Sequence, residues 1–240
     1  MLARGLGRTN MTNRPRNRVD SDIACGLTTA RWIGGSCLDL VSDFNDRYLE
    51  SLARAAERGC VAAAPAIVRA HRALWLAVND KVRQRASTCP FLLADFQFSN
   101  VSWWRRAQSG ERLDLPDPMV WDFPWIIAVD LARDALTVAW YAARQDICLA
   151  TLLIGVPAQV AEIISKFTLQ ALWRLADHYH PYLRPRYESR SGFWNRLLSA
   201  AARDDRDALH DLHRSAFLFV DSEHEHRASA RSRGTIGRGS

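Results

Sequence analysis

The sequence predicts an all-α fold, a helical bundle with a helix-turn-helix-like C-terminal half. Between residues 38 and 219, apolar residues recur three and four positions apart, which is the spacing of one helix face. Glycine, proline and small polar residues stand where these runs begin or end, as they do at helix caps. No strand is evident anywhere in the chain, so helices alone are expected to build the core.

Composition is compatible with a globular protein and with a nucleic-acid partner. Hydrophobic residues make up 48% of the 240 residues, which is enough to fill a core. The formal net charge is +6, and of the 32 lysines and arginines only Lys81 and Lys166 are lysines. Arginine binds phosphate in a bidentate manner and stacks on bases, which favours a nucleic-acid ligand. The alternative is that a GC-rich genome encodes arginine where other genomes encode lysine.

Four segments are expected along the chain. Residues 1–28 are a basic arm and residues 223–240 are a charged, Ser/Gly/Arg-rich tail, and both are expected to be disordered. Residues 29–120 form an N-terminal helical region of unknown role, and residues 121–222 form a second helical domain. The N-terminus lacks the apolar core of a secretory signal, and the best apolar stretch, 147–156, is too short to span a bilayer. We therefore expect a cytoplasmic protein without membrane contact.

Two helices of the N-terminal region are expected to pack as an antiparallel hairpin. The first begins near Leu38 and ends at Gly59, and the second begins at Pro65 and continues to about Val82. Residues 86–118 lose the helical period and are expected to be a long connection with one short turn. An aromatic cluster brackets this connection and is expected to attach it to the core, the alternative being a ligand surface. The cluster consists of Trp103, Trp104, Trp121, Phe123 and Trp125.

The C-terminal half begins with a long helix, expected over residues 126–153, whose apolar positions nearly encircle it. Gly155 ends this helix, and a short helix follows from Pro157 to Lys166. Thr168 then caps a helix that prolines end after Tyr179. Further helices are expected over 192–198 and 205–219. A helix that is apolar on more than one side must be covered, and a subunit interface is a common place for it.

Two short helices joined by a tight turn and followed by arginines form the outline of a helix-turn-helix. A family resemblance in this segment rests on an ordered set of residues. They are Asp130, Ala139, Gln145, Asp146, Ala150, Gly155, Val156, Ala161, Thr168, Leu169, Leu175, Ala176, Arg186 and Tyr187. In these residues the chain resembles the flagellar transcriptional activator FlhD family over residues 126–220. Residues 1–125 have no counterpart in that family.

The resemblance implies an all-α subunit that forms a homodimer through its long first helix. It also implies a complex with an FlhC-like partner, binding to promoter DNA, and indirect contact with RNA polymerase. The candidate dimer-interface residues are Leu131, Leu136, Trp140 and Ile147. The position of the family's inter-subunit cysteine falls on Leu183, so no disulfide between subunits is expected there.

Arginines gather behind the predicted helical pair and are the candidate DNA-binding residues. They are Arg184, Arg186, Arg190, Arg196, Arg203 and Arg206. Arginine contacts to phosphate would position the protein on a duplex and would weaken as the salt concentration rises. The alternative is a solvated surface on which Glu188, Asp204 and Asp205 pair with these arginines. A helical adaptor without DNA binding, associated with secretion or conjugation, is the corresponding alternative function.

The sequence predicts neither an enzyme nor a metal or cofactor site. His178 and His180 with Asp177, or His224 with His226, could bind a metal, but ligands two residues apart on a helix point away from one another. The acidic and histidine residues from 204 to 213 are explained by an exposed helix. No C-x-x-C pair, phosphate-binding glycine loop or nucleophile elbow is present. The five scattered cysteines, Cys25, Cys37, Cys60, Cys89 and Cys148, are expected to be small buried hydrophobes.

Overall fold

The computed structural model describes residues 36–58, 64–115, 124–188 and 190–215. These residues belong to one compact unit that begins at Ser36. The basic arm expected over 1–28 and the tail expected over 223–240 lie outside the described residues, as do Trp121 and Phe123.

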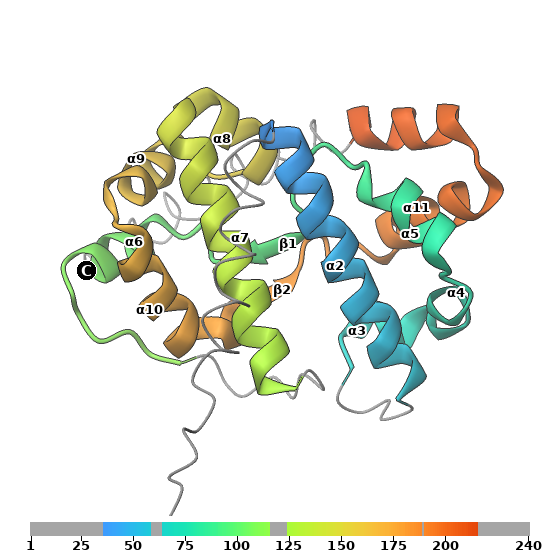
Figure 1. Ribbon diagram of the computed structural model, residues 1–240, viewed down its shortest axis with the longest axis horizontal. Helices are drawn as coiled ribbons and strands as arrows, with labels where there is room; N and C mark the ends of the chain where they lie inside the picture. The colour runs from blue at the N-terminus through green and yellow to red at the C-terminus, as the bar shows by residue number, and fades with distance from the viewer. Residues whose placement is uncertain (1–35, 59–63, 116–123, 189, 216–240) are drawn as a thin grey trace, which may run out of the picture. The chain divides into compact units, whose positions relative to one another are not determined.

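The described part of the chain is mainly helical, and the predicted all-α class is confirmed (Figure 1). The elements in chain order are α2 (Cys37–Glu57), α3 (Ala66–Ala70), α4 (Arg72–Leu76), α5 (Asp80–Ser87), β1 (Ala94–Phe96), α6 (Val101–Gln108), α7 (Trp125–Gln145), α8 (Ile147–Ile154), α9 (Ala158–Lys166), α10 (Leu169–Tyr179), the 3₁₀ turn η1 (His180–Tyr182), β2 (Leu183–Pro185) and α11 (Ser191–Arg203). Residues 206–215 are also helical. The second N-terminal helix, expected to be continuous from Pro65, is instead the three short helices α3, α4 and α5.

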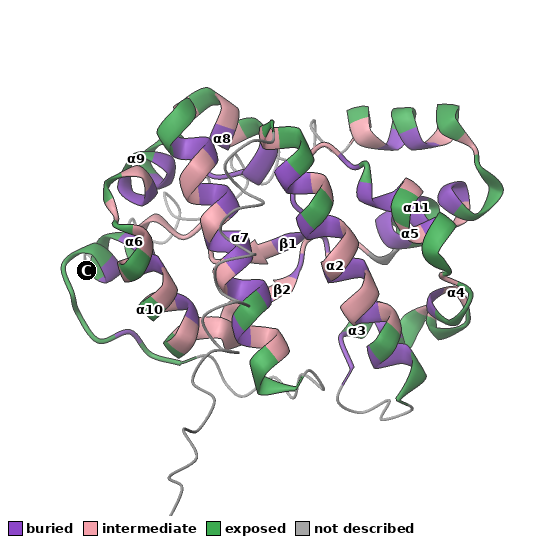
Figure 2. Ribbon diagram, in the orientation of Figure 1, coloured by how far each residue is buried: buried purple, intermediate pink, exposed green. Residues whose placement is uncertain are grey.

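The long helices α2 and α7 lie side by side at the centre and run in opposite directions (Figure 1). Ser36 caps α2 with a reciprocal capping box, in which its side chain accepts the Asp39 amide and the Asp39 carboxylate accepts the Ser36 amide. The faces that meet are buried, as the purple bands of Figure 2 show. The apolar surface of α7 is therefore covered by α2, α8, α9 and α10 of the same chain.

This packing contradicts two of the four predicted dimer-interface residues. Leu131 and Leu136 are 2% and 0% exposed, so neither side chain is on a surface that a second subunit could contact. Trp140 is half-buried and donates its indole N–H to the carbonyl of Phe167 at 2.9 Å. Ile147 is half-buried at the start of α8. The composition of α7 correctly indicated that other elements must pack around this helix. The elements that do so belong to the same chain.

The helix expected over residues 126–153 is broken at Asp146. This residue has extended backbone angles (φ −162°, ψ 131°), which ends α7, and its carboxylate accepts the amides of Cys148 and Leu149, which begins α8. Aspartate is a preferred N-cap, so the side chain stabilises a new helix start at the place where the old helix ends.

The segment expected to be a long connection runs through the most buried part of the core. Phe91, Leu92, Leu93, Ala94 and Phe96 are all 0% exposed. Three of these residues lead into β1, which pairs antiparallel with β2. The expectation that the chain has no strand is therefore wrong. The strands were missed because a three-residue strand is too short to show an alternating pattern in the sequence.

The order of elements occurs twice in the described part of the chain. A long helix, a set of short helices, a strand and a final helix run from α2 to α6 and again from α7 to α11. Both long helices have 21 residues. The strands of the two halves pair with Asp95 opposite Arg184, so the pairing itself has two-fold symmetry.

One hydrogen bond is repeated in both halves. The indole of Trp104 in α6 donates to the carbonyl of Gln97, the residue directly after β1, at 3.1 Å. The indole of Trp194 in α11 donates to the carbonyl of Arg186, the residue directly after β2, at 2.8 Å. Both tryptophans are fully buried. The shared order of elements and this shared hydrogen bond indicate that the two halves are structural repeats.

The last helix of each half packs against short helices of the other half. Helix α6 packs on α9, and α11 packs on α4 and α5. The Leu92 amide also donates to the carbonyl of Leu153 at 2.9 Å. The domain boundary expected at residue 120 therefore lies inside one compact unit, and the two halves share a single core.

No single helix among the described residues is both long and apolar enough to cross a bilayer. Helices α8 and α9 reach that length and composition only when they are joined, and they are bent by 111° with respect to each other.

Asp134 gives a prediction about pH. Its carboxylate is 7% exposed on α7 and pairs with Arg47 on α2. Burial raises the pKa of this carboxyl from 3.8 to about 6, although Arg47 opposes the shift. Since the folded state holds the proton more tightly than the unfolded state, this group stabilises the fold below about pH 4 and the contribution is lost as the pH rises through about 6.

Asp134→Asn is therefore expected to flatten the pH dependence. Between about pH 4 and pH 7 the wild type should lose on the order of 2–3 kcal/mol relative to this variant. Urea unfolding of both proteins at several pH values measures the difference. Parallel stability curves over that range would show that the carboxyl titrates normally.

Candidate nucleic-acid interface

The six candidate arginines do not form one surface. The structure places Arg184 in β2 and Arg186 directly after it, at the centre of the core. Arg190 stands immediately before α11, whereas Arg196, Arg203 and Arg206 are on α11 and the helix that follows.

Arg186 is a structural residue. Its guanidinium donates to the carbonyls of Ile154 at 3.0 Å and Leu92 at 3.4 Å, and it lies 5.4 Å from the ring centroids of Phe91 and Tyr187. These contacts connect β2 to the end of α8 and to the segment before β1. The guanidinium is consequently occupied inside the protein, and the prediction that it binds DNA is not supported by its position.

Arg184 and Arg190 are both half-buried. Arg184 lies opposite Asp95 in the strand pair, and its Nε is buried without a hydrogen-bond partner. The backbone amide of Arg190 donates to the carbonyl of Tyr187 at 2.8 Å and shapes the turn that leads into α11. These contacts do not bring Arg184 or Arg190 next to the exposed arginines of α11.

Arg196, Arg203 and Arg206 are exposed. Arg196 and Arg203 are seven residues apart, close to two full turns, so they lie on the same face of α11. Among the described residues, none of the three forms an ion pair with a carboxylate. They are the part of the predicted set that a polyanion could reach.

The carboxylates that were expected to neutralise these arginines have other partners. Glu188 accepts the Ala66 amide at 3.3 Å. Asp204 pairs with Arg85 on α5 at 2.9 Å. Asp205 accepts the Ala208 amide at 2.9 Å and so caps the helix of residues 206–215. The alternative of an internally neutralised arginine cluster therefore does not hold for these three carboxylates.

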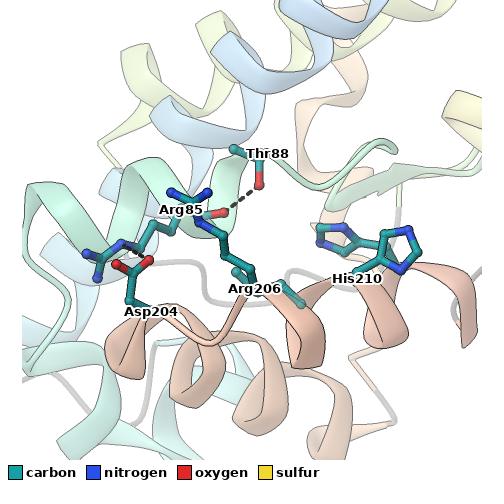
Figure 3. Close-up of a pocket in the computed structure, with 7 residues that line it drawn as sticks. Arg85, Thr88, Asp204, Arg206 and His210 are labelled. Atoms are coloured by element: carbon teal, nitrogen blue, oxygen red, sulfur yellow. Dashed lines mark hydrogen bonds and ion pairs between the residues drawn. The ribbon is translucent and has the colours of Figure 1, made fainter.

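A groove of about 480 Å³ lies next to this face, between α5 and the helix of residues 206–215 (Figure 3). It is lined by Arg85, Thr88, Asp204, Arg206, Leu209, His210 and His213. Arg85 donates to the carbonyl of Ala201 at 3.1 Å in addition to its ion pair with Asp204. Burial is the main reason that the pKa of His213 is lowered to about 4, and the nearby His210 lowers it further. This imidazole is therefore neutral at pH 7. Arg206 is thus the exposed cation of the groove that has no carboxylate pair among the described residues.

The predicted helical pair is present as α9 and α10. Thr168 caps α10 by accepting the Ala171 amide at 3.2 Å, in the turn that the sequence predicted. Both helices pack on α7, and α9 also packs on α6. The outer side of α10 exposes Gln170, Arg174 and His178 at intervals of four residues. Helix α10 thus packs on α7 with one side and exposes the other side to solvent.

Sequence reasoning did not single out several exposed cations on α6 and α10. Arg105 and Arg106 are exposed on α6, and Arg174 is exposed on α10. The signal was present in the run Trp103-Trp104-Arg105-Arg106, where two buried tryptophans fix the opposite side of a short helix as the solvent side. Trp103 and Trp104 attach α6 to the core as expected, whereas Trp125 of the same predicted cluster is 64% exposed.

Within the described residues, no group of three or more histidine, cysteine, aspartate or glutamate side chains could hold a metal ion. Nδ1 of His178 is 3.0 Å from the carbonyl oxygen of Arg174, and Nδ1 of His180 is 3.1 Å from that of Asp177. Of the cysteines, Cys89 is buried as expected, and burial raises the pKa of its thiol, but Cys148 is exposed. His224, His226, Cys25 and Cys60 lie outside the described residues.

No family model, no curated protein and no solved structure matches this chain. The resemblance to FlhD stays a prediction that rests on the residues quoted for it.

Proposed function

We propose that the protein is a DNA-binding transcriptional regulator similar to FlhD. The observation that carries the proposal is the exposed face of α11 and its continuation, where Arg196, Arg203 and Arg206 have no carboxylate partner among the described residues. The function rests on these arginines and on the α9–α10 pair. It does not rest on Arg186, which is bound inside the core.

The chemistry of this face suits a phosphate backbone. Guanidinium groups bind phosphate with paired hydrogen bonds, and each phosphate that is neutralised releases counterions from the duplex. Arg196 and Arg203 lie on one side of a helix, so both can face the same duplex. Arg174 is exposed on α10, the helix that would enter the major groove in a helix-turn-helix, so it adds a cation to the proposed surface.

The triple variant Arg196→Ala/Arg203→Ala/Arg206→Ala is expected to lose most of its affinity for duplex DNA. The slope of log K against log salt concentration should become shallower by about 2–3, since each lost phosphate contact removes about 0.9. Fluorescence anisotropy with a labelled duplex from the DNA upstream of the gene, between about 50 and 200 mM salt, measures both quantities.

A charge-matched control separates this face from a general effect of net charge. Arg69 on α3, Arg112 in the segment after α6 and Arg144 on α7 are exposed, and their replacement with alanine also removes three charges. The control variant should retain the wild-type slope to within about one unit. Equal losses in both variants would mean that α11 has no special role and that the binding is non-specific.

A helical adaptor without DNA binding is the second candidate. Trp125 and Ile126 at the start of α7 are 64% and 65% exposed, and large exposed apolar side chains favour a protein partner. An FlhC-like protein is the partner that the resemblance implies. The adaptor function predicts no salt-dependent retention of DNA by the wild-type chain, so the same titration separates the two candidates.

A further inference from the structure

The two-fold repeat makes α6 the counterpart of α11. Each follows the strand of its own half and packs on the short helices of the other half. Arg106 is the sixth residue of α6, Arg196 is the sixth residue of α11, and both are exposed. A basic side chain therefore occurs at equivalent positions on opposite sides of the α2–α7 pair (Figure 1).

The short helices before each strand are also equivalent. Asn79 caps α5 and Thr168 caps α10, and the same number of residues separates each cap from the first residue of its strand. Arg85 and Arg174 are each the sixth residue after the cap. The repeat thus extends from the core to the outward positions of these helices.

The two copies are not identical. In the first half, Arg85 pairs with Asp204 beside the helix of residues 206–215. In the second half, Arg174 is exposed. Arg106 pairs with Glu111 at 3.1 Å, but both side chains are largely exposed, so a phosphate could displace that carboxylate at little cost.

We propose that one copy of this chain presents two basic surfaces, Arg105 and Arg106 on α6 and Arg196 and Arg203 on α11, of which Arg106 and Arg196 hold equivalent positions, and binds as a monomer to duplex DNA with two half-sites in inverted orientation. The inference rests on the proposed DNA-binding function and adds the symmetry and stoichiometry of the site. Helix-turn-helix dimers recognise such sites because the two-fold axis of the protein matches that of the duplex. Here both halves are covalently joined, and their strands are related by the local two-fold symmetry of an antiparallel pair, with Asp95 opposite Arg184.

The first test is selection of the full-length protein against a pool of random duplexes, followed by mass measurement of the complexes by light scattering. The expected result is an enriched inverted repeat that carries one chain per duplex. Two chains per inverted repeat, or an enriched site without internal symmetry, would overturn the inference and leave the DNA-binding function intact. A chain that enriches no sequence and shows no salt-dependent retention would overturn both.

The second test compares matched variants on the selected duplex. Arg105→Ala/Arg106→Ala and Arg196→Ala/Arg203→Ala remove two charges from equivalent helices, and each is expected to lower the affinity by roughly tenfold. Arg69→Ala/Arg144→Ala removes two exposed charges elsewhere and should lower it less than twofold. Thermal unfolding of all variants checks that the fold is retained. A loss confined to the α11 variant would show that the chain has one DNA surface and not two.

Discussion

Replacement of Asn45 with alanine is expected to lower the free energy of unfolding by about 3 kcal/mol or more. Asn45 is 0% exposed on α2, and its amide holds the segment that leads into β1. Nδ2 donates to the carbonyls of Cys89 and Phe91 at 3.2 and 2.9 Å, and Oδ1 accepts the Leu93 amide at 2.9 Å. The alanine variant would leave three buried backbone groups without the partner that Asn45 provides, and each such group costs about 1–3 kcal/mol.

Chemical denaturation with urea measures this loss. Asn195→Ala is the matched control, because Asn195 is exposed on α11 and its side chain makes one long hydrogen bond, with Ser199 at 3.4 Å. The control should change the stability by less than about 0.5 kcal/mol. A similarly small change in Asn45→Ala would mean that water or a local shift replaces the amide and that the segment does not depend on α2.

Gly155→Ala is expected to destabilise the fold by a similar amount, about 3 kcal/mol, for two separate reasons. The backbone of Gly155 has φ +71°, a conformation that costs a residue with a Cβ about 1 kcal/mol. An added Cβ would also lie 1.7 Å from Nη2 of Arg186 and 2.6 Å from its Cζ. The guanidinium would have to move away and give up its hydrogen bonds to Ile154 and Leu92.

Gly110 provides a control for the backbone part alone. Its φ is +75°, but nothing lies within 4 Å of an added Cβ, so Gly110→Ala should cost only about 1 kcal/mol. In the Arg186→Ala background, Gly155→Ala should likewise cost only about that much, which a double-mutant cycle would show as strong non-additivity. Equal costs for the two glycines in the wild-type background would contradict the close contact between Gly155 and Arg186.

Helix positions were predicted well where short-range signals decide them. The capped turn at Thr168 and the stop at Gly155 lie where the sequence placed them, because caps and left-handed glycines act within a few residues. The break at Asp146 was missed although aspartate is a strong N-cap, because the apolar pattern continues on both sides of it. The apolar pattern shows which residues are buried, but it does not show whether the helix is continuous.

The candidate site was predicted only in part. Six arginines close in sequence were treated as one cluster, but Arg186 is directed into the core and Arg196, Arg203 and Arg206 face solvent. The difference arises because Arg186 follows a strand whose partner, β1, lies in the other half of the chain. A residue's neighbours across such a pair cannot be read from the residues beside it in sequence.

Local signals in the sequence were enough to predict the all-α class, the starts or ends of several helices, and the need to cover α7. These features follow from periodicity and capping, which are local. The tertiary structure was needed to show that α2 packs on α7, that the segment of residues 91–96 lies in the core, and that the order of elements occurs twice in the described part of the chain. Those features depend on which distant segments meet, and several long-range pairings are compatible with the same local pattern.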